Sequence, residues 1–227
     1  MDSGADTRMA AGEVVSIEQD YGDRLARARV GLWIVLIAVG LLFAGLTVVY
    51  MARQGFLPLG EAEAHPVHGW GKVRLPNRLL VLNTVVLLIS SLTMEALRRA
   101  SRQAVALVQV KSIPGVSLGE EKTRPWLATT VGLGLLFLAG QLQAWRMLAQ
   151  RGFYMATNPS SSFTYLLTGT HAVHLAGGIV ALLWVGLLSW RKQGAEQRSI
   201  RIEMLAWYWH FMGLLWVYVL GLLEWGG

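Results

Sequence analysis

The stretch VGLWIVLIAVGLLFAGLTVVYMA, residues 30–52, decides the fold class of this 227-residue chain. It contains no charged residue and exceeds the ~20 apolar residues that a helix needs to cross a bilayer. Four further apolar stretches follow, at residues 79–97, 126–148, 163–190 and 204–225, and none has Lys or Arg in its middle. The sequence therefore predicts an all-α membrane bundle of five transmembrane helices.

The basic residues between these stretches alternate sharply. Fourteen of the twenty lie before the first stretch, between the second and third, or between the fourth and fifth, and six lie in the remaining segments. Loops rich in Lys and Arg stay in the cytoplasm. The alternation predicts a cytoplasmic N-terminus and an external C-terminus.

Composition leaves little room for a soluble domain, because 54% of residues are hydrophobic and only 15% are charged. Residues 1–23 are predicted to form a polar, mobile cytoplasmic tail, and residues 24–227 to form the membrane domain. The net charge of +6 is assigned to short cytoplasmic loops near anionic lipid and not to nucleic-acid binding. The chain has no cysteine, which excludes disulfides, thiolate zinc and iron–sulfur clusters.

The external loop at residues 55–76 holds four groups that bind metals in other proteins, Glu61, Glu63, His65 and His68. Their spacing fits no closed metal site, so we interpret them as solvated loop residues.

Two histidines stand out in the fourth stretch. His171 and His174 are three residues apart and share a helix face, which Gly178 extends. Imidazoles inside a membrane are costly and should point into protein. A haem or metal pair is one interpretation, but further ligands are scarce. We favour a pair that is hydrogen-bonded to neighbouring helices.

Small residues form a second stripe on the same stretch. Such stripes let helix backbones approach closely. The predicted packing residues are Thr168, Ala172, Ala176, Gly177 and Gly178.

The fifth stretch begins with acidic and aromatic residues. Glu203, Trp207 and His210 are predicted to share one face, with His210 roughly 10 Å deeper than Glu203 at ~1.5 Å rise per residue. Such a carboxylate and imidazole could relay protons, or they could pair with another helix. Glu95, near the cytoplasmic end of the second stretch, is expected to pair with Arg98 or Arg99.

Other polar and aromatic residues have structural interpretations. Asn83, Thr84, Gln141 and Gln143 lie inside stretches and should make interhelical hydrogen bonds. Tryptophans at the stretch ends should anchor the helices at the membrane interface. The predicted anchors are Trp126, Trp190 and Trp225.

Motifs along residues 25–227 resemble subunit III of the haem–copper oxidases, in its five-helix form. They occur in the expected order, one set for each helix. The motifs are Gly31-Leu-Trp…Phe43-Ala-Gly…Tyr50; Leu75-Pro…Asn83-Thr…Ser90-Ser-Leu-Thr-Met-Glu; Gln141…Ala144-Trp-Arg…Ala156-Thr-Asn-Pro-Ser-Ser-Ser; Leu167-Thr-Gly-Thr-His-Ala-Val-His…Gly177-Gly; and Glu203…Tyr208-Trp-His-Phe…Trp216.

Two positions depart from the family pattern. The family usually has a serine followed by a glutamate in the middle of its first helix, where this chain has Ala38 and Val39. An aspartate often follows the His-Phe pair of the last helix, where this chain has Gly213. Roles that the family assigns to those acids do not transfer to this chain.

The resemblance implies a non-catalytic subunit of a respiratory terminal oxidase of the cytochrome c oxidase type, in a bacterial cytoplasmic membrane. Haem and copper would lie in partner subunits, with no catalytic or metal site in this chain. Its expected partners are the catalytic subunit I, subunit II, bound phospholipid and, as a further candidate, a larger respiratory supercomplex. Its expected work is to stabilise subunit I, hold lipid and support proton uptake. The residues for interhelical or proton-uptake support are His171, His174, Glu203, His210 and Glu95.

Three alternatives stay open at this point. The chain could be the homologous accessory subunit of a quinol oxidase or of a nitric oxide reductase, because the electron donor docks on other subunits. A small transporter would need a polar path through the midplane, where residues such as Val86 and Val217 are apolar. A stand-alone membrane enzyme lacks paired acids or a nucleophile–base set.

Overall fold

The computed structural model describes residues 3–53, 76–109, 123–153, 159–189 and 195–226. These residues form five long helices: α1 (Ser3–Arg53), α2 (Asn77–Gln109), α3 (Thr123–Gln150), α4 (Pro159–Ser189) and α5 (Ala195–Gly226). Each contains a segment long and apolar enough to cross a membrane. The predicted five-helix membrane bundle is confirmed.

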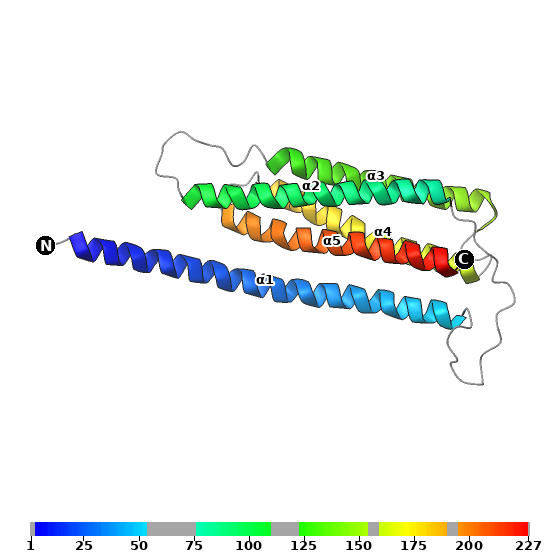
Figure 1. The fold of residues 1–227 in the computed structure, drawn as a ribbon, viewed down its shortest axis with the longest axis horizontal. Coiled ribbons are helices and arrows are strands. Elements are labelled where there is room, and N and C mark those ends of the chain that lie inside the picture. The colour runs from blue at the N-terminus through cyan, green and yellow to red at the C-terminus, as the bar shows by residue number, and fades with distance from the viewer. Residues whose placement is uncertain (1–2, 54–75, 110–122, 154–158, 190–194, 227) are drawn as a thin grey trace.

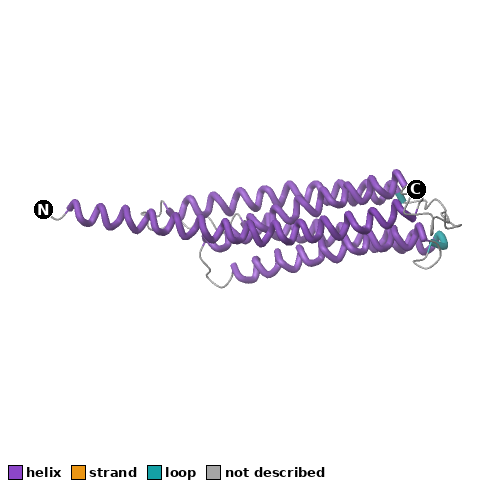
Figure 2. The backbone as a smooth tube through the Cα atoms, turned by 90° about the horizontal axis from the view of Figure 1, so that it is seen from below, coloured by secondary structure: helices purple, strands orange, loops and turns teal. Residues whose placement is uncertain are grey.

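The helices run side by side along one long axis, and the two ends of the chain lie at opposite ends of the molecule (Figure 1). α2 packs most closely against α3 and α5, while α4 covers α3 and α5 from the other side. Figure 2 shows the same near-parallel arrangement from below, with the first part of α1 extending beyond the other helices.

α1 packs against the bundle through one face of the helix. Leu36, Val39, Phe43, Thr47 and Tyr50 are buried at steps of three or four residues, the spacing of one helix face. Thr47 accepts a 2.8 Å hydrogen bond from the Tyr218 hydroxyl of α5. The opposite side of α1 is broadly exposed, as expected for a surface that faces lipid.

The helices extend beyond the predicted stretches. α1 begins at Ser3, so the tail that we predicted to be mobile is helical from that residue, and α2 continues twelve residues past Leu97 to Gln109. Hydropathy marks the part of a helix inside the hydrocarbon, whereas backbone hydrogen bonding can continue through polar sequence. The cytoplasmic location of residues 1–23 remains a prediction.

Local sequence signals fix several helix ends. Pro159 is the first residue of α4, where its missing N–H costs nothing. α3 ends at Gln150, and Gly152 follows two residues later with a φ of 83° that suits glycine. Gly152 N–H donates to Ala149 O at 3.0 Å and Phe153 N–H to Leu148 O at 3.1 Å. This pair of bonds is a Schellman motif that satisfies the last carbonyls of the helix.

Candidate functional site

Charged side chains gather where α2 meets α5, at the end of the bundle predicted to be cytoplasmic. The α2–α5 ion-pair cluster consists of Glu95, Arg98, Arg99, Arg102 and Glu203. The four α2 members are spaced i, i+3, i+4 and i+7, which places them on one helix face. Glu203 enters this face from α5, so the cluster links two helices.

Glu203 is the most buried member, with an exposed fraction of only 5%. Arg102 binds it through both carboxylate oxygens, with Nε to Oε2 at 2.9 Å and Nη2 to Oε1 at 2.6 Å. Arg98 reaches the same carboxylate with Nη1 3.5 Å from Oε1. Bidentate guanidinium–carboxylate pairs are among the stronger and more directional contacts in proteins.

Glu95 is held within α2. Arg98 donates to it through Nε at 2.8 Å and Nη2 at 2.9 Å, and Arg99 donates through Nε at 2.9 Å. The pairing of Glu95 with Arg98 and Arg99 that we predicted from spacing is present. Arg98 contacts both carboxylates and therefore joins the two halves of the cluster.

His210 lies at the edge of this cluster. Its Nε2 is 3.8 Å from Glu95 Oε2, which is too long for a hydrogen bond. Trp207, predicted to share a face with Glu203 and His210, is instead 49% exposed, whereas Ala206 and Trp209 are buried. α5 therefore directs Glu203 toward α2 and Trp207 toward the outer surface.

His171 lies in a different environment, deeper in the bundle. Phe137 of α3 contacts it edge-on with ring centroids 5.8 Å apart, and Trp216 of α5 lies at 5.1 Å. Phe137 and Trp216 also pack together at 4.9 Å, and we call these three rings the aromatic box. His171 is fully buried, and neither ring nitrogen has a hydrogen-bond partner among the described residues.

His174 also differs from our expectation of bonds to neighbouring helices. Its Nδ1 is 2.8 Å from the carbonyl oxygen of Thr170, one turn earlier in the same helix. Its ring packs edge-on against Phe43 of α1 at 6.1 Å. The interhelical bond at this residue involves its backbone, since the Tyr208 hydroxyl donates to His174 O at 2.9 Å. Among the described residues, neither histidine side chain makes the interhelical hydrogen bond that we predicted for it.

In the described part of the chain, no group of three or more His, Asp or Glu side chains is arranged so that it could hold a metal ion. The structure thus adds no further ligand to His171 and His174. The loop residues Glu61, Glu63, His65 and His68 lie outside the described residues, as does Trp190. Of the other predicted interfacial anchors, Trp126 and Trp225 are exposed at opposite ends of the bundle.

The small-residue stripe on α4 divides into two parts. A Cβ added at Gly178 would come within 3.1 Å of the Tyr208 ring of α5, so this glycine permits close packing. Gly177 faces open space and contributes no such approach. Thr168 is buried and accepts a 3.0 Å hydrogen bond from Trp145 Nε1, while Ala172 and Ala176 are half-buried.

The interhelical bond predicted for Thr84 is present, since Trp216 Nε1 of α5 donates to Thr84 Oγ1 of α2 at 3.0 Å. Its tryptophan partner was not predicted, and neither was a second bond between the same helices, in which Trp209 Nε1 donates to Ser90 Oγ at 3.1 Å. The signal was present as tryptophans inside a span, whose indole N–H needs a partner when buried. Asn83 and Gln141, expected to bond between helices, each retain one buried polar atom without a partner in the described chain.

The two positions that depart from the family pattern are both at helix contacts. Val39 is 6% exposed on the face of α1 that packs against the bundle. Gly213 faces α2, where an added Cβ would lie 3.3 Å from Ser91 Oγ. An acid at either position would be placed within the protein and away from lipid.

Known proteins similar to this chain are oxidase subunits. Cytochrome c oxidase subunit 3 of Synechocystis sp. is 28% identical over 82% of this chain and 70% of its own length. The same subunit of Thermostichus vulcanus is 26% identical over 85% of this chain and 84% of its own. Cytochrome bo(3) ubiquinol oxidase subunit 3 of Pseudomonas aeruginosa is 25% identical over 83% and 80%.

No family model matches the chain. The curated relatives nevertheless align across most of the five helices, and they carry the same subunit name in two kinds of oxidase. The chain is therefore a homologue of subunit III of the haem–copper oxidases.

Proposed function

We propose that this chain is the non-catalytic subunit III of an aerobic respiratory haem–copper terminal oxidase of the cytochrome c oxidase type. The observation that carries the proposal is similarity to oxidase subunit 3 over 82–85% of the chain. The chain would assemble with subunits I and II in a bacterial cytoplasmic membrane. Haem and copper would reside in those partners.

The geometry favours a structural role over a transport role. All five helices are continuous through their membrane-spanning segments, whereas many transporters use broken helices to form a polar site at mid-membrane. The ion pairs lie near one end of the bundle, and the deep His171 is covered by aromatic rings. Such an arrangement stabilises a helix bundle that can cover one flank of a catalytic subunit.

A second part of the proposal is that this chain supports proton uptake by the oxidase. Glu95 and Glu203 lie at the end predicted to be cytoplasmic, but each is bound by arginine. The geometry therefore supports a fixed electrostatic surface more than a carboxylate that picks up and releases protons. His210, at the edge of the cluster, is partly exposed and has no short bond to Glu95.

A quinol oxidase is the second candidate for the assembled complex. The similarity to the bo(3) ubiquinol oxidase subunit of Pseudomonas aeruginosa is nearly as high as the similarity to the cytochrome c oxidase subunits. The electron donor is bound by other subunits in either case, so this chain would do the same work in both complexes.

Purification through a tag on this chain tests the proposal. The expected product contains subunits I and II by mass spectrometry, shows a haem absorption spectrum and reduces oxygen. Reduced cytochrome c and a ubiquinol, supplied separately, identify the donor. A chain that purifies without any haem protein, from membranes that have oxidase activity, would overturn the proposal.

The proposed orientation yields a separate prediction. The N-terminus and the 98–124 segment should be cytoplasmic and Gly227 external, because fourteen of the twenty basic residues fall on the former side. Reporter fusions at Lys111 and Gly227 should therefore give opposite signals. The same signal at both positions would contradict five spans with this orientation.

A further inference from the structure

A cavity of about 500 Å³ lies at the same end of the bundle as the ion-pair cluster, between α3, α4 and α5, with Leu97 of α2 also in its lining. It is bordered by the first turns of α3 and α5 and by the last turns of α4. We call it the arginine cavity, and its main lining residues are Arg124, Leu127, Leu183, Leu187, Arg198 and Ile202. None of these residues belongs to the α2–α5 ion-pair cluster or to the aromatic box.

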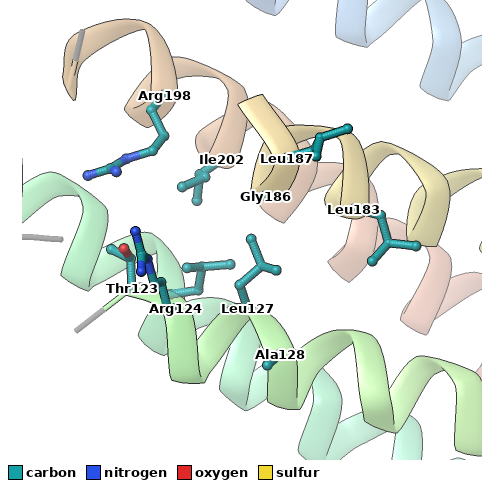
Figure 3. A pocket seen from close by; sticks show the side chains of 10 residues that line it. Thr123, Arg124, Leu127, Ala128, Leu183, Gly186, Leu187, Arg198 and Ile202 are labelled. Carbon is teal, nitrogen blue, oxygen red and sulfur yellow. The ribbon is translucent and has the colours of Figure 1, made fainter. Parts of the chain in front are cut away.

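The polar and apolar lining groups are separated along the cavity. Figure 3 shows Arg124 and Arg198 at one end, beside Thr123, with Leu127, Leu187 and Leu183 extending away from them. Arg198 is only 8% exposed, so its guanidinium is placed largely within the protein. A ligand that matches this lining has an anionic group at one end and a hydrocarbon chain at the other.

The cavity is accessible from the surface that faces lipid. Leu183 is 51% exposed and Leu187 is 49% exposed, both on α4. Two small residues line the cavity at this level: Ala128 has only a methyl group, and Gly186 lets the Leu127 side chain approach α4, since an added Cβ would lie 3.3 Å from Leu127 Cδ2. The volume lies within the ~300–1,000 Å³ of typical sites for small organic ligands.

The two arginines lie at the ends of the helices, and this position indicates which class of ligand the cavity can bind. Thr123 is the first residue of α3, and Arg198 lies in the first turn of α5, so both helix N-termini are beside the arginines. Helix N-termini carry partial positive charge, and arginine binds phosphate oxygens in a bidentate manner. The cytoplasmic leaflet is rich in anionic lipid, and basic pockets between transmembrane helices on this side bind phosphate headgroups.

We propose that the arginine cavity binds one anionic phospholipid of the cytoplasmic leaflet. Its phosphate lies between Arg124 and Arg198, and one acyl chain runs along Leu127, Leu183 and Leu187. The site rests on the proposed function in one respect, since it gives a place and a headgroup class to the lipid that such a subunit would hold. The cavity is separate from the surface through which α1 packs against the other helices, because no α1 residue lines it.

The test counts lipid that remains bound to the intact complex. The wild-type complex and an Arg124→Gln/Arg198→Gln variant, both purified through subunit I, are delipidated and incubated with dioleoylphosphatidylglycerol or dioleoylphosphatidylcholine. Intact-complex mass spectrometry then gives the number of each lipid bound. The wild type should retain one phosphatidylglycerol more than the double variant, with roughly 25-fold weaker retention in the variant, or about fivefold per arginine.

Two further variants separate charge from folding. Arg146→Gln removes an exposed arginine near the other end of α3 and should leave the lipid count unchanged. Ala128→Phe keeps both arginines but fills the apolar part of the cavity, and it should also lose one phosphatidylglycerol. This second variant keeps the proposal testable if the double variant fails to assemble.

Several results would overturn the lipid site. Equal phosphatidylglycerol counts in the wild-type and Ala128→Phe complexes would do so, as would equal retention of phosphatidylcholine by the wild type. A cross-link that shows another protein segment inside the cavity would also overturn the lipid site. Absence of this chain from the subunit I preparation would instead refute the proposed function, so the two failures can be told apart.

Discussion

The α2–α5 ion-pair cluster and the aromatic box lie at two depths of one bundle. Their buried polar groups differ in whether they have hydrogen-bond partners. Near the end of the helices, Glu203 is buried but bound by Arg102 through both oxygens. Deeper in the bundle, His171 is buried between Phe137 and Trp216 with no bond to either ring nitrogen in the described chain. The charge of Glu203 is thus compensated by arginines near the helix ends, where long basic side chains can reach water. The deep site instead contains an imidazole, which can be neutral.

The stability of the bundle should therefore respond differently when the polar groups of these two sites are removed. Loss of Glu203 removes the carboxylate that Arg102 binds, while Arg98 keeps Glu95, and the loss should destabilise the bundle. Loss of the polar atoms of His171 removes groups that make no bond, so shape should matter there more than hydrogen bonding.

Among the substitutions that remove polar groups without opening an aromatic-sized cavity, the largest expected effect is at Glu203. Glu203→Ala should lower the stability of the subunit in the complex by about 2–3 kcal/mol. This is less than the ~3–5 kcal/mol for a fully buried pair, because the Arg102 side chain is 54% exposed and water can solvate it. Retention of the subunit during thermal challenge of the purified complex measures the change. Glu224→Ala, at an exposed carboxylate near the other end of α5, is the control. It loses only a long, exposed 3.4 Å contact with Asn77 Nδ2 of α2 and should have a much smaller effect; equal losses from the two variants would contradict the cluster's role.

A smaller effect is expected when His171 is replaced by an apolar ring. His171→Phe should change stability by less than about 1 kcal/mol, because it fills the same space and removes two buried, unbonded nitrogens. His171→Ala should cost about 3 kcal/mol by leaving a cavity, a value typical of buried aromatic truncation. Denaturation of the purified complex, followed by tryptophan fluorescence, distinguishes the two variants. If His171→Phe were as damaging as His171→Ala, the ring nitrogens would have a role that packing does not explain.

The smallest effect is expected at His210, at the edge of the cluster. Its 3.8 Å separation from Glu95 and its partial exposure limit the contact to less than about 1 kcal/mol. His210→Gln, which keeps hydrogen-bonding capacity but does not titrate near neutral pH, should assemble and turn over like the wild type from acid to alkaline pH. A proton relay predicts otherwise: normal assembly with a steep loss of turnover at alkaline pH, where protons are scarce. Oxygen consumption against pH for both complexes decides between packing and relay.

Much of this architecture follows from sequence because it depends on local patterns. Hydropathy gave the five helices, and the i, i+3 and i, i+4 spacings gave the pairing of Glu95 with Arg98 and Arg99. The partner of Glu203 was not predictable in this way, since Arg102 is 101 residues away in the chain. That pairing depends on the register of α5 against α2, which hydrophobic periodicity does not determine.

The environment of His171 shows the same limit. Its helix face was predictable, but Phe137 and Trp216 come from two other helices. We therefore expected hydrogen bonds where the structure has aromatic rings. The start of α1 at Ser3 was missed for another reason, because the hydropathy of residues 1–23 reports their polarity and not their backbone conformation.

The most direct test of a non-catalytic role is haem and metal analysis of the separated subunit. The subunit, dissociated from the purified oxidase, should contain no stoichiometric haem, copper or zinc, while the remaining complex keeps its full complement. Elemental analysis together with an absorption spectrum of both fractions gives the answer. About one metal or haem per separated chain would contradict a non-catalytic subunit and would return His171 and His174 to the role of ligands.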